Sequence, residues 1–298
     1  MFDLCCGDRS AAAYKIVHRP KPISLTKEMD TAIKKLLWYA PNIDSFQAVK
    51  NELVQDSIYD AFSFTYLMRR MGMDEDRDVK WLEPNAAFDE ADWTFFENKI
   101  CCHCQKIIIT RQKNLSKTND LLRCLRNCIA HGHFAVVDDY IIGFNRQVTK
   151  SHPEGIKKAV IKLKPQLLLN ALESLTAEYA KVLLVGFAFE RVGYHVVREP
   201  AFPGFRFDLL IDKDQRQYAV EIKTFPGSTY VHPEQLNTFL TVSDRQLPGI
   251  ERVLFIDTSK VTKDVRKLES ETENFRIVDI TQVKELLKDN PVDILAGS

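Results

Sequence analysis

The stretch "FDLLIDKDQRQYAVEIK" at 207–223 contains two expected apolar strands, and three charged side chains within these strands are the first candidates for chemistry. Asp208 begins one expected strand, while Glu221 and Lys223 lie two residues apart in the next. A charge inside a strand that buries apolar side chains is costly unless it is paired or holds a metal ion. Because side chains alternate between the two faces of a strand, Glu221 and Lys223 are expected on the same face.

These residue types suit the hydrolysis of phosphodiester bonds. If the two strands are neighbours, Asp208 and Glu221 meet at one edge and can bind Mg²⁺, with Mn²⁺ as the substitute ion. Such an ion lowers the pKa of a bound water and stabilises negative charge in the transition state, and Lys223 can orient that water or support the same charge. The alternative is an exposed edge strand that carries a surface Glu–Lys pair.

The elements around this stretch follow an α/β order. We expect a helix over 176–192 that ends at Gly193, then strands at 194–198, 207–212 and 217–223, and a helix after Pro233. A strand at 252–257, a helix at 261–270, a strand at 275–280 and a helix at 281–289 follow. This αβββαβ order with an appended αβα predicts an α/β domain over 176–298.

The spacing of Asp208 from "EIK" at 221–223, together with the preceding "FERVGYHVVREPAFPGFRFDLLI", resembles the PD-(D/E)xK nuclease superfamily of restriction endonucleases and Holliday-junction resolvases. The likeness is to the resolvase and Mrr-like branches and covers about residues 176 to 260. It implies a restriction endonuclease-like core, Asp208 and Glu221 as metal ligands, and Lys223 as the catalytic lysine. Phe207 stands where the family pattern has proline.

Relatives in that superfamily also carry a glutamate on the first helix. Glu178 is the candidate here, although it lies about a turn further from Gly193 than the pattern suggests. Glu190 is nearer but is expected on another face of the helix. Gln235, just after "HP", stands where relatives place a polar helix residue near the site.

A second unusual stretch, "LLRCLRNCIAHGHF", lies in the first half of the chain. Arg126 and His131 are five residues apart on an expected helix, so their directions differ by about 140° and they do not share a tight stripe. Arg126, Asn127 and His131 match the motif of the HEPN domain, and this stretch resembles that helical bundle of prokaryotic toxins and defence ribonucleases. The resemblance implies a second site, built across a dimer, in which His131 acts as acid or base on a ribose 2′-hydroxyl and Arg126 holds the phosphate. A structural role at the helix end is the other interpretation.

The rest of residues 1–175 is predicted to be mainly helical, a HEPN-like bundle with a small β hairpin. One of its helices is expected over 88–110, and the hairpin turns at Asp138-Asp139. In the strand-to-helix segment that begins with "KKAVIKL" at 157–163, three lysines are expected to share a face, which is either a contact patch for a nucleic-acid backbone or a solvated edge: Lys158, Lys162 and Lys164.

The chain has seven cysteines, and the spacing of Cys101 and Cys104 would suit zinc if another pair converged on them. Cys124 and Cys128 are the only nearby option in the sequence. The apolar neighbours of "CCHC" at 101–104 favour ordinary buried thiols instead. Cys5 and Cys6, close to the start, give no further indication.

Composition sets the remaining limits. The 298 residues carry a formal net charge of zero and are 45% hydrophobic, so the chain can build a sizeable core and has no global positive field to attract nucleic acid. The longest apolar run, Val182 to Phe189, is too short to span a bilayer, and no signal peptide is visible. An odd number of cysteines favours reduced thiols and a cytoplasmic protein without membrane contact.

The sequence therefore predicts two domains, 1–175 and 176–298, in a Mg²⁺-dependent endonuclease, with DNA favoured as the substrate and RNA as the alternative. The two resemblances imply prokaryotic anti-phage or toxin-type defence, a homodimer through the N-terminal domain, and a partner protein from the same defence system. One alternative is a HEPN ribonuclease toxin with an accessory C-terminal domain. The other is a nucleic-acid-binding adaptor that does not cleave.

Overall fold

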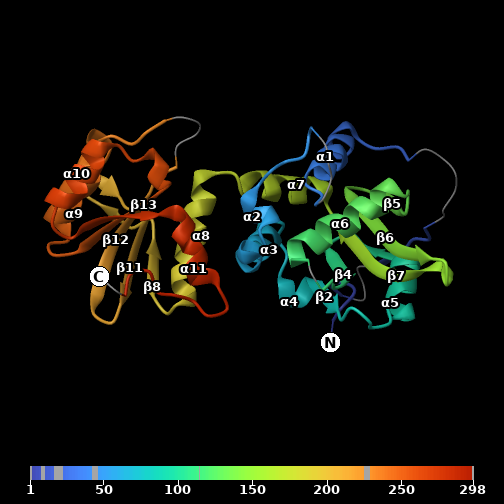
Figure 1. Cartoon of the computed structure of the whole chain (residues 1–298). Coiled ribbons are helices and arrows are strands. Elements are labelled where there is room, and N and C mark those ends of the chain that lie inside the picture. The colour runs from blue at the N-terminus through green and yellow to red at the C-terminus, as the bar shows by residue number, and fades with distance from the viewer. Residues whose placement is uncertain are drawn as a thin grey trace. The chain divides into compact units, whose positions relative to one another are not determined.

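The computed structural model divides into two compact units, unit 1 (Met1–Leu175) and unit 2 (Thr176–Ser298). Figure 1 shows both, coloured along the chain. The structure describes residues 2–7, 11–16, 23–41, 46–113, 115–224 and 229–296.

Unit 1 mixes helices and strands. Its helices are α1 (Lys27–Trp38), α2 (Glu52–Gln55), α3 (Asp60–Arg70), α4 (Glu75–Asp78), α5 (Glu90–Asn98), α6 (Lys117–Ala130) and α7 (Pro165–Ser174). Its strands are β1 (Ala11–Ala13), β2 (Val79–Leu82), β3 (Lys99–Cys101), β4 (Lys106–Thr110), β5 (Phe134–Val137), β6 (Tyr140–Thr149) and β7 (His152–Leu163).

A five-stranded mixed sheet in the order β2-β4-β7-β6-β5 forms the centre of unit 1, and β1 pairs with β3 beside it. The β5–β6 hairpin turns at Asp138-Asp139 as predicted, with Val137 opposite Tyr140. The expectation of a mainly helical bundle with a small hairpin is wrong, because β6 and β7 are long strands and β4 lies inside the sheet. Helices pack on this sheet. Helix α6 lies against β6, and the aromatic side chains of α5 pack against buried residues of β4, β6 and β7.

The predicted helix over 88–110 ends early, at Asn98. The three consecutive isoleucines at 107–109 are β-branched and favour a strand over a helix. All five residues of β4 are buried, so this strand is covered on both faces and lacks the apolar–polar alternation that marks a half-exposed strand. The interpretation of β7 as a lysine-bearing surface is also wrong at Lys162, which is fully buried between β4 and β6.

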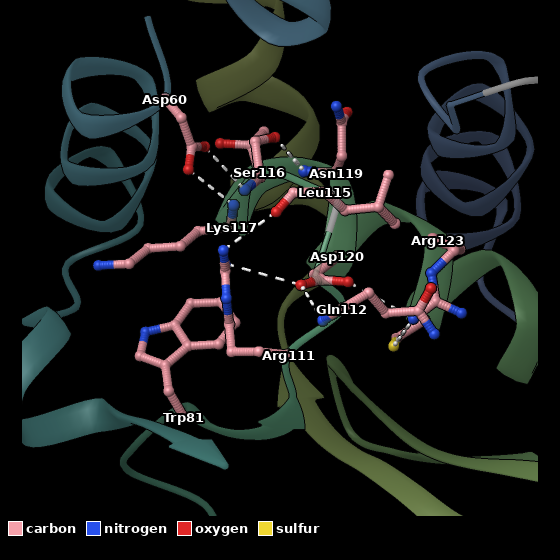
Figure 2. A network of polar contacts seen from close by, with 12 residues as sticks. Asp60, Trp81, Arg111, Gln112, Leu115, Ser116, Lys117, Asn119, Asp120 and Arg123 are labelled. Carbon is pink, nitrogen blue, oxygen red and sulfur yellow. Dashed lines mark hydrogen bonds and ion pairs between the residues drawn. The ribbon is translucent and has the colours of Figure 1, made fainter. Parts of the chain in front are cut away.

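Helix α6, which carries the second candidate site, is held at its start by polar contacts (Figure 2). Asp60 of α3 accepts hydrogen bonds from the backbone N–H groups of Lys117 and Thr118, at 2.7 and 3.0 Å. These are N–H groups without a partner inside the helix, and a negative charge is favourable at this end. The side chain of Asp120 is fully buried, with Arg111 and Arg123 at 3.6 and 3.5 Å.

Unit 2 has helices on both faces of one sheet. Its helices are α8 (Glu178–Arg191), α9 (Asn237–Gln246), α10 (Lys263–Glu271) and α11 (Val283–Leu287). Its strands are β8 (His195–Arg198), β9 (Ala201–Phe202), β10 (Phe205–Arg206), β11 (Leu209–Lys213), β12 (Arg216–Ile222), β13 (Glu251–Ile256) and β14 (Phe275–Asp279). The αβββαβ order with an appended αβα is as predicted, with the short β9–β10 hairpin inserted before β11.

The sheet of unit 2 has the order β14-β13-β12-β11-β8, antiparallel from β8 to β12 and parallel from β12 to β14. Helices α8 and α11 lie on one side and α9 and α10 on the other (Figure 1). Phe189 of α8 packs against Phe255 on the first side, whereas Ala219 belongs to the core on the α9 side. Since Ala219 and Glu221 are two residues apart on β12, Glu221 lies on the α9 side too. No helix of the described residues is long and apolar enough to cross a membrane.

Candidate active site

Asp208, Glu221 and Lys223 come together where β11 begins and β12 ends. The pairing of these antiparallel strands stops at Leu209 and Val220. Just beyond it, the Ile222 backbone N–H donates to Asp208 Oδ2 at 2.7 Å. The Lys223 ammonium donates to Glu221 Oε1 at 2.5 Å. The two carboxylates and the lysine therefore share one end of the central strands.

The order of residues in this segment explains the arrangement. Phe207 is fully buried and its ring contacts Phe202, Phe205 and Phe239. This anchor fixes the chain just before β11, and the next residue, Asp208, reaches the end of β12 through its hydrogen bond with the Ile222 backbone N–H. The proline of the family pattern is thus replaced by an aromatic residue that the core holds in place.

Burial dominates the electrostatics of the site. Glu221 is only 4% exposed, and burial followed by the charge of Asp208 raises its pKa to about 7, against the opposing effect of Lys223. Burial also raises the pKa of Asp208, and the charges of Glu178 and Glu199 add to this effect. For Lys223, burial alone would lower the pKa, but Glu221, Asp208 and Glu178 together raise it. The lysine is therefore charged, while at least one carboxyl group resists ionisation near neutral pH.

Glu178 and Glu190 lie at opposite ends of α8. Twelve residues of helix separate them by about 18 Å, and Glu190 forms an ion pair with Arg198 at 2.8 Å. Glu178 is exposed, yet its charge affects both Asp208 and Lys223. It is thus the helix glutamate near the site, whereas Glu190 is engaged elsewhere. Gln235 accepts a hydrogen bond from the His232 backbone N–H at 2.8 Å and stabilises its own helical turn.

Glu199 is a residue near the site that sequence reasoning missed. Its backbone N–H donates to the Asp208 carbonyl oxygen at 2.9 Å, and its charge contributes to the raised pKa of Asp208. It adopts a left-handed φ of 49° directly before Pro200. A residue before proline is biased towards extended conformations, so nothing in the sequence indicated this turn.

The site suits a hard divalent cation. Glu221 Oε2 is buried and accepts no hydrogen bond from the described residues, and a buried acceptor without a partner costs about 1–3 kcal/mol. A cation beside this oxygen would supply the partner, and carboxylate oxygens are the ligands that Mg²⁺ prefers. Within the described ranges, the oxygens of Asp208, Glu221 and Glu178 do not all come within 4.8 Å of one another. Asp208 and Glu221 lie at the adjoining ends of β11 and β12, and the charge of Asp208 acts on Glu221, so these two carboxylates could hold an ion, with waters completing its coordination.

The second predicted site is only partly assembled in one chain. Asn127 and His131 line a cavity of about 360 Å³ in unit 1, but Arg126 does not, and the buried Nε of Arg126 has no hydrogen-bond partner among the described residues. The cavity is basic, and its other charged lining residues are Arg123, Arg146 and Lys158, with His133 beside them.

The residues "AHGH" at 130–133 serve mainly to end helix α6, which is a structural role and requires no catalysis. The backbone N–H groups of Gly132 and His133 donate to the carbonyls of Ile129 and Cys128 at 3.1 and 2.8 Å. This is the Schellman pattern, and Gly132 has the left-handed φ of 66° that it requires. His131 occupies the cap position with its backbone, so its imidazole is not needed to end the helix.

Comparison with known proteins finds one family over part of the chain. Residues 178–287 match the Mrr_cat family, described as a restriction endonuclease. Among solved structures, a protein of unknown function shares 13% identity at a TM-score of 0.27, covering 33% of this chain and 55% of that one. A repair endonuclease from Pyrococcus abyssi shares 14% sequence identity at a TM-score of 0.28, covering 48% of this chain and 63% of that one. The chain thus spans less than two thirds of either structure, and no curated protein matches it.

Those two structural likenesses are too slight to carry an inference. The family match is different, because it covers α8 to α11 and includes Asp208, Glu221 and Lys223. The elements of unit 2 also follow the αβββαβ order of restriction endonuclease-like folds. Residues 178–287 are therefore similar to restriction endonucleases, and this match supports a nuclease of the PD-(D/E)xK superfamily.

Proposed function

We propose that the protein is a metal-dependent endonuclease that hydrolyses phosphodiester bonds at the Asp208–Glu221–Lys223 site. The observation that supports this most is Glu221 Oε2, a buried carboxylate oxygen without a hydrogen-bond partner among the described residues. In an ordinary surface Glu–Lys pair, that oxygen would be exposed to water. A buried oxygen without a hydrogen-bond partner is instead available to a cation. Mg²⁺ is the proposed ion and Mn²⁺ its substitute.

Each residue has one proposed task. Asp208 and Glu221 hold the ion, which when bound lowers the pKa of a water and offsets negative charge on the phosphate. Lys223 stays protonated between the carboxylates and places its ammonium towards the water or a phosphate oxygen. Glu178 adds negative charge at the edge of the site and keeps Lys223 charged. In the proposed reaction the attacking water passes its proton to solvent as the new P–O bond forms, and the bond to the leaving oxygen breaks as that oxygen takes up a proton from solvent.

The proposal is tested with the purified full chain on labelled DNA and RNA in Mg²⁺, in Mn²⁺ and in EDTA. We expect cleavage of DNA with either ion and none in EDTA. Cleavage that continues in EDTA would move the activity to another site, and the absence of cleavage under every condition would favour a non-catalytic nucleic-acid-binding adaptor.

A second candidate activity is a HEPN-type ribonuclease in unit 1. The basic cavity beside Asn127 and His131 favours contact with phosphate groups, but Arg126 would have to come from a partner chain or rearrange. A ribonuclease of this kind needs no metal, so RNA cleavage in EDTA that His131→Ala abolishes would establish it. With Asp208→Ala as the matched control, the two activities can be assigned separately.

The biological setting is proposed from both resemblances. A homodimer through unit 1 would bring two α6 helices together, and closed twofold dimers are the commonest homo-oligomers. Prokaryotic anti-phage or toxin-type defence, with a partner protein that triggers cleavage, is the setting in which a nuclease coupled to such a unit would act.

A further inference from the structure

Three thiols that are far apart in the sequence converge in unit 1. The sulfur atoms of Cys5, Cys6 and Cys101 all lie within 4.8 Å of one another, and Cys6 Sγ is 3.4 Å from Cys101 Sγ. In a tetrahedral zinc site with bonds of about 2.3 Å, the sulfurs stand about 3.8 Å apart. The observed separations therefore suit four-coordinate zinc, and 3.4 Å is far beyond the length of a disulfide bond.

Cys104 is the candidate for the fourth ligand. Its sulfur does not lie within 4.8 Å of all three of the other sulfurs, so its side chain would move closer to complete the tetrahedron, but it already contacts two of these cysteines. Its sulfur is hydrogen-bonded to the Cys101 side chain and accepts a hydrogen bond from the Cys6 backbone N–H. The His103 backbone N–H points at Cys101 Sγ at 3.4 Å. Cys101-x-x-Cys104 has the ligand spacing of zinc sites, and N–H groups directed at sulfur stabilise thiolates. Cys124 and Cys128, the pair that the sequence left open, are not among the thiols that converge here.

Those two cysteines have other neighbours. Cys124 Sγ accepts a hydrogen bond from Asn145 Nδ2 at 3.3 Å, and Cys128 packs directly against Gly143. Both lie on α6 and are buried. Cys102 is also outside the cluster, because it is exposed and its sulfur contacts the ring of His103 at 3.4 Å.

A buried lysine beside the thiols is an independent observation. The Lys162 side chain is fully buried, and its ammonium donates to the Cys101 carbonyl oxygen at 2.8 Å and to Cys104 Sγ at 3.5 Å. Among the described residues, no carboxylate lies within ion-pair distance of it. By contrast, the neighbouring buried Lys106 has Asp78 at 3.0 Å. A buried cation needs a negative partner, and a zinc ion with four thiolates carries a net charge of −2.

We propose that Cys5, Cys6, Cys101 and Cys104 form a structural site for one Zn²⁺ ion. The adjacent Lys162 ammonium would offset the negative charge of this site. Binding would release four thiol protons and leave a site closed to further ligands, as in structural rather than catalytic zinc centres. This proposal is independent of the nuclease site, whose donors are oxygens in unit 2.

The site would fasten the start of the chain to the sheet of unit 1. Phe2 and Leu4 pack against the apolar cluster that includes Trp93, and β1 pairs with β3 in the register Ala11 to Cys101. Cys101 ends β3, and Cys104 lies two residues before β4. Four metal–sulfur bonds would thus join a short terminal segment to the turn that leads into the central strand.

The first test compares full-length wild type with Cys5→Ser/Cys6→Ser and with the control Cys102→Ser, all purified under reducing conditions from zinc-supplemented cells. Mass spectrometry of the elements should find one more zinc per chain in wild type and Cys102→Ser than in the double variant. The carboxylate site of unit 2 is unchanged in all three proteins, so zinc bound there does not affect the difference in zinc content. Circular dichroism checks that the double variant remains folded; if it does not, Cys104→Ser replaces it.

The second test identifies the ligands by Co²⁺ substitution. Wild type should show the intense sulfur-to-cobalt charge-transfer absorption of a tetrahedral thiolate site, which carboxylates cannot produce, and the double variant should not. Lys162→Met should weaken zinc binding by about 10- to 100-fold against a chromophoric chelator, as expected when a supporting contact is lost. Equal zinc in all three proteins, iron in place of zinc, or a Cys6–Cys101 disulfide under reducing conditions would each overturn the proposal.

Discussion

Replacing Glu221 with glutamine should stabilise unit 2 at neutral and alkaline pH when no metal is present. Burial and the charge of Asp208 raise the pKa of Glu221 in the folded protein to about 7, from an ordinary value of 4.5. Because the folded-state pKa is the higher one, the folded state binds the proton more tightly. This stabilising contribution is complete below about pH 4.5 and is lost as the pH rises through about 7. At about 1.4 kcal/mol per pH unit, the loss amounts to about 3 kcal/mol.

The assay must follow unit 2 alone, and the sequence permits this. All three tryptophans, Trp38, Trp81 and Trp93, lie in unit 1, so fluorescence reports only that unit. Far-UV circular dichroism reports both units, and its additional transition belongs to unit 2. Urea unfolding in EDTA at about pH 5 and about pH 8 then gives the change in unfolding free energy for wild type and for Glu221→Gln.

Wild-type unit 2 should lose most of the 3 kcal/mol between the two pH values, in excess of any loss in Glu221→Gln. Adding Mg²⁺ at about pH 8 should restore stability to wild type only, because the ion binds the ionised carboxylate. Identical pH dependence in the two proteins would mean that Glu221 is not desolvated in the folded protein, against the prediction.

The other predictions concern neighbouring charges and assembly. Lys223→Ala and Lys223→Arg should both retain Mn²⁺ binding by calorimetry but lose about 10²-fold or more in single-turnover cleavage; wild-type turnover in the arginine variant would make the lysine a bystander. Glu178→Gln should lower the pKa of Asp208 in NMR titration, whereas Glu190→Gln, at the far end of α8, should not, and the reverse would exchange their roles. Asp120→Ala leaves two arginines facing a buried gap and should destabilise unit 1 by about 3–5 kcal/mol in urea unfolding followed by fluorescence; a loss below 1 kcal/mol would show that Arg111 and Arg123 are well solvated. Light scattering of the full chain at tens of micromolar should give twice the monomer mass, and a clean monomer would count against assembly through unit 1.

Unit 2 was predictable because its signals are local. Gly193 ends the first helix, each strand is a short apolar run bounded by turn residues, and Pro233 opens the next helical segment. The meeting of Glu221 and Lys223 was predictable for the same reason, since both are charges within one strand. Glu199 was not, because its position depends on a left-handed turn before a proline that local propensities disfavour.

The predictions for unit 1 failed where burial in the folded protein, rather than the local sequence pattern, decides the structure. Residues 106–110 were taken into a helix because an evenly buried strand lacks alternation, and only the pairing of β4 with β2 and β7 makes it a strand. Lys162 looked like a surface lysine because a sequence alone does not reveal that its strand is central. The meeting of Cys6 with Cys101 joins residues 95 positions apart, which no spacing rule connects.

Asp208 and Glu221 are proposed to hold the ion on which nuclease activity depends. The most direct test measures Mn²⁺ affinity and DNA cleavage for Asp208→Asn, with Asp212→Asn as the matched control. Asp212 lies on the same strand but pairs with His195 at 2.9 Å, away from the site. We expect Asp208→Asn to lose cleavage by orders of magnitude and to bind Mn²⁺ much more weakly, while Asp212→Asn behaves as wild type. Cleavage at the wild-type rate by Asp208→Asn would contradict this proposal.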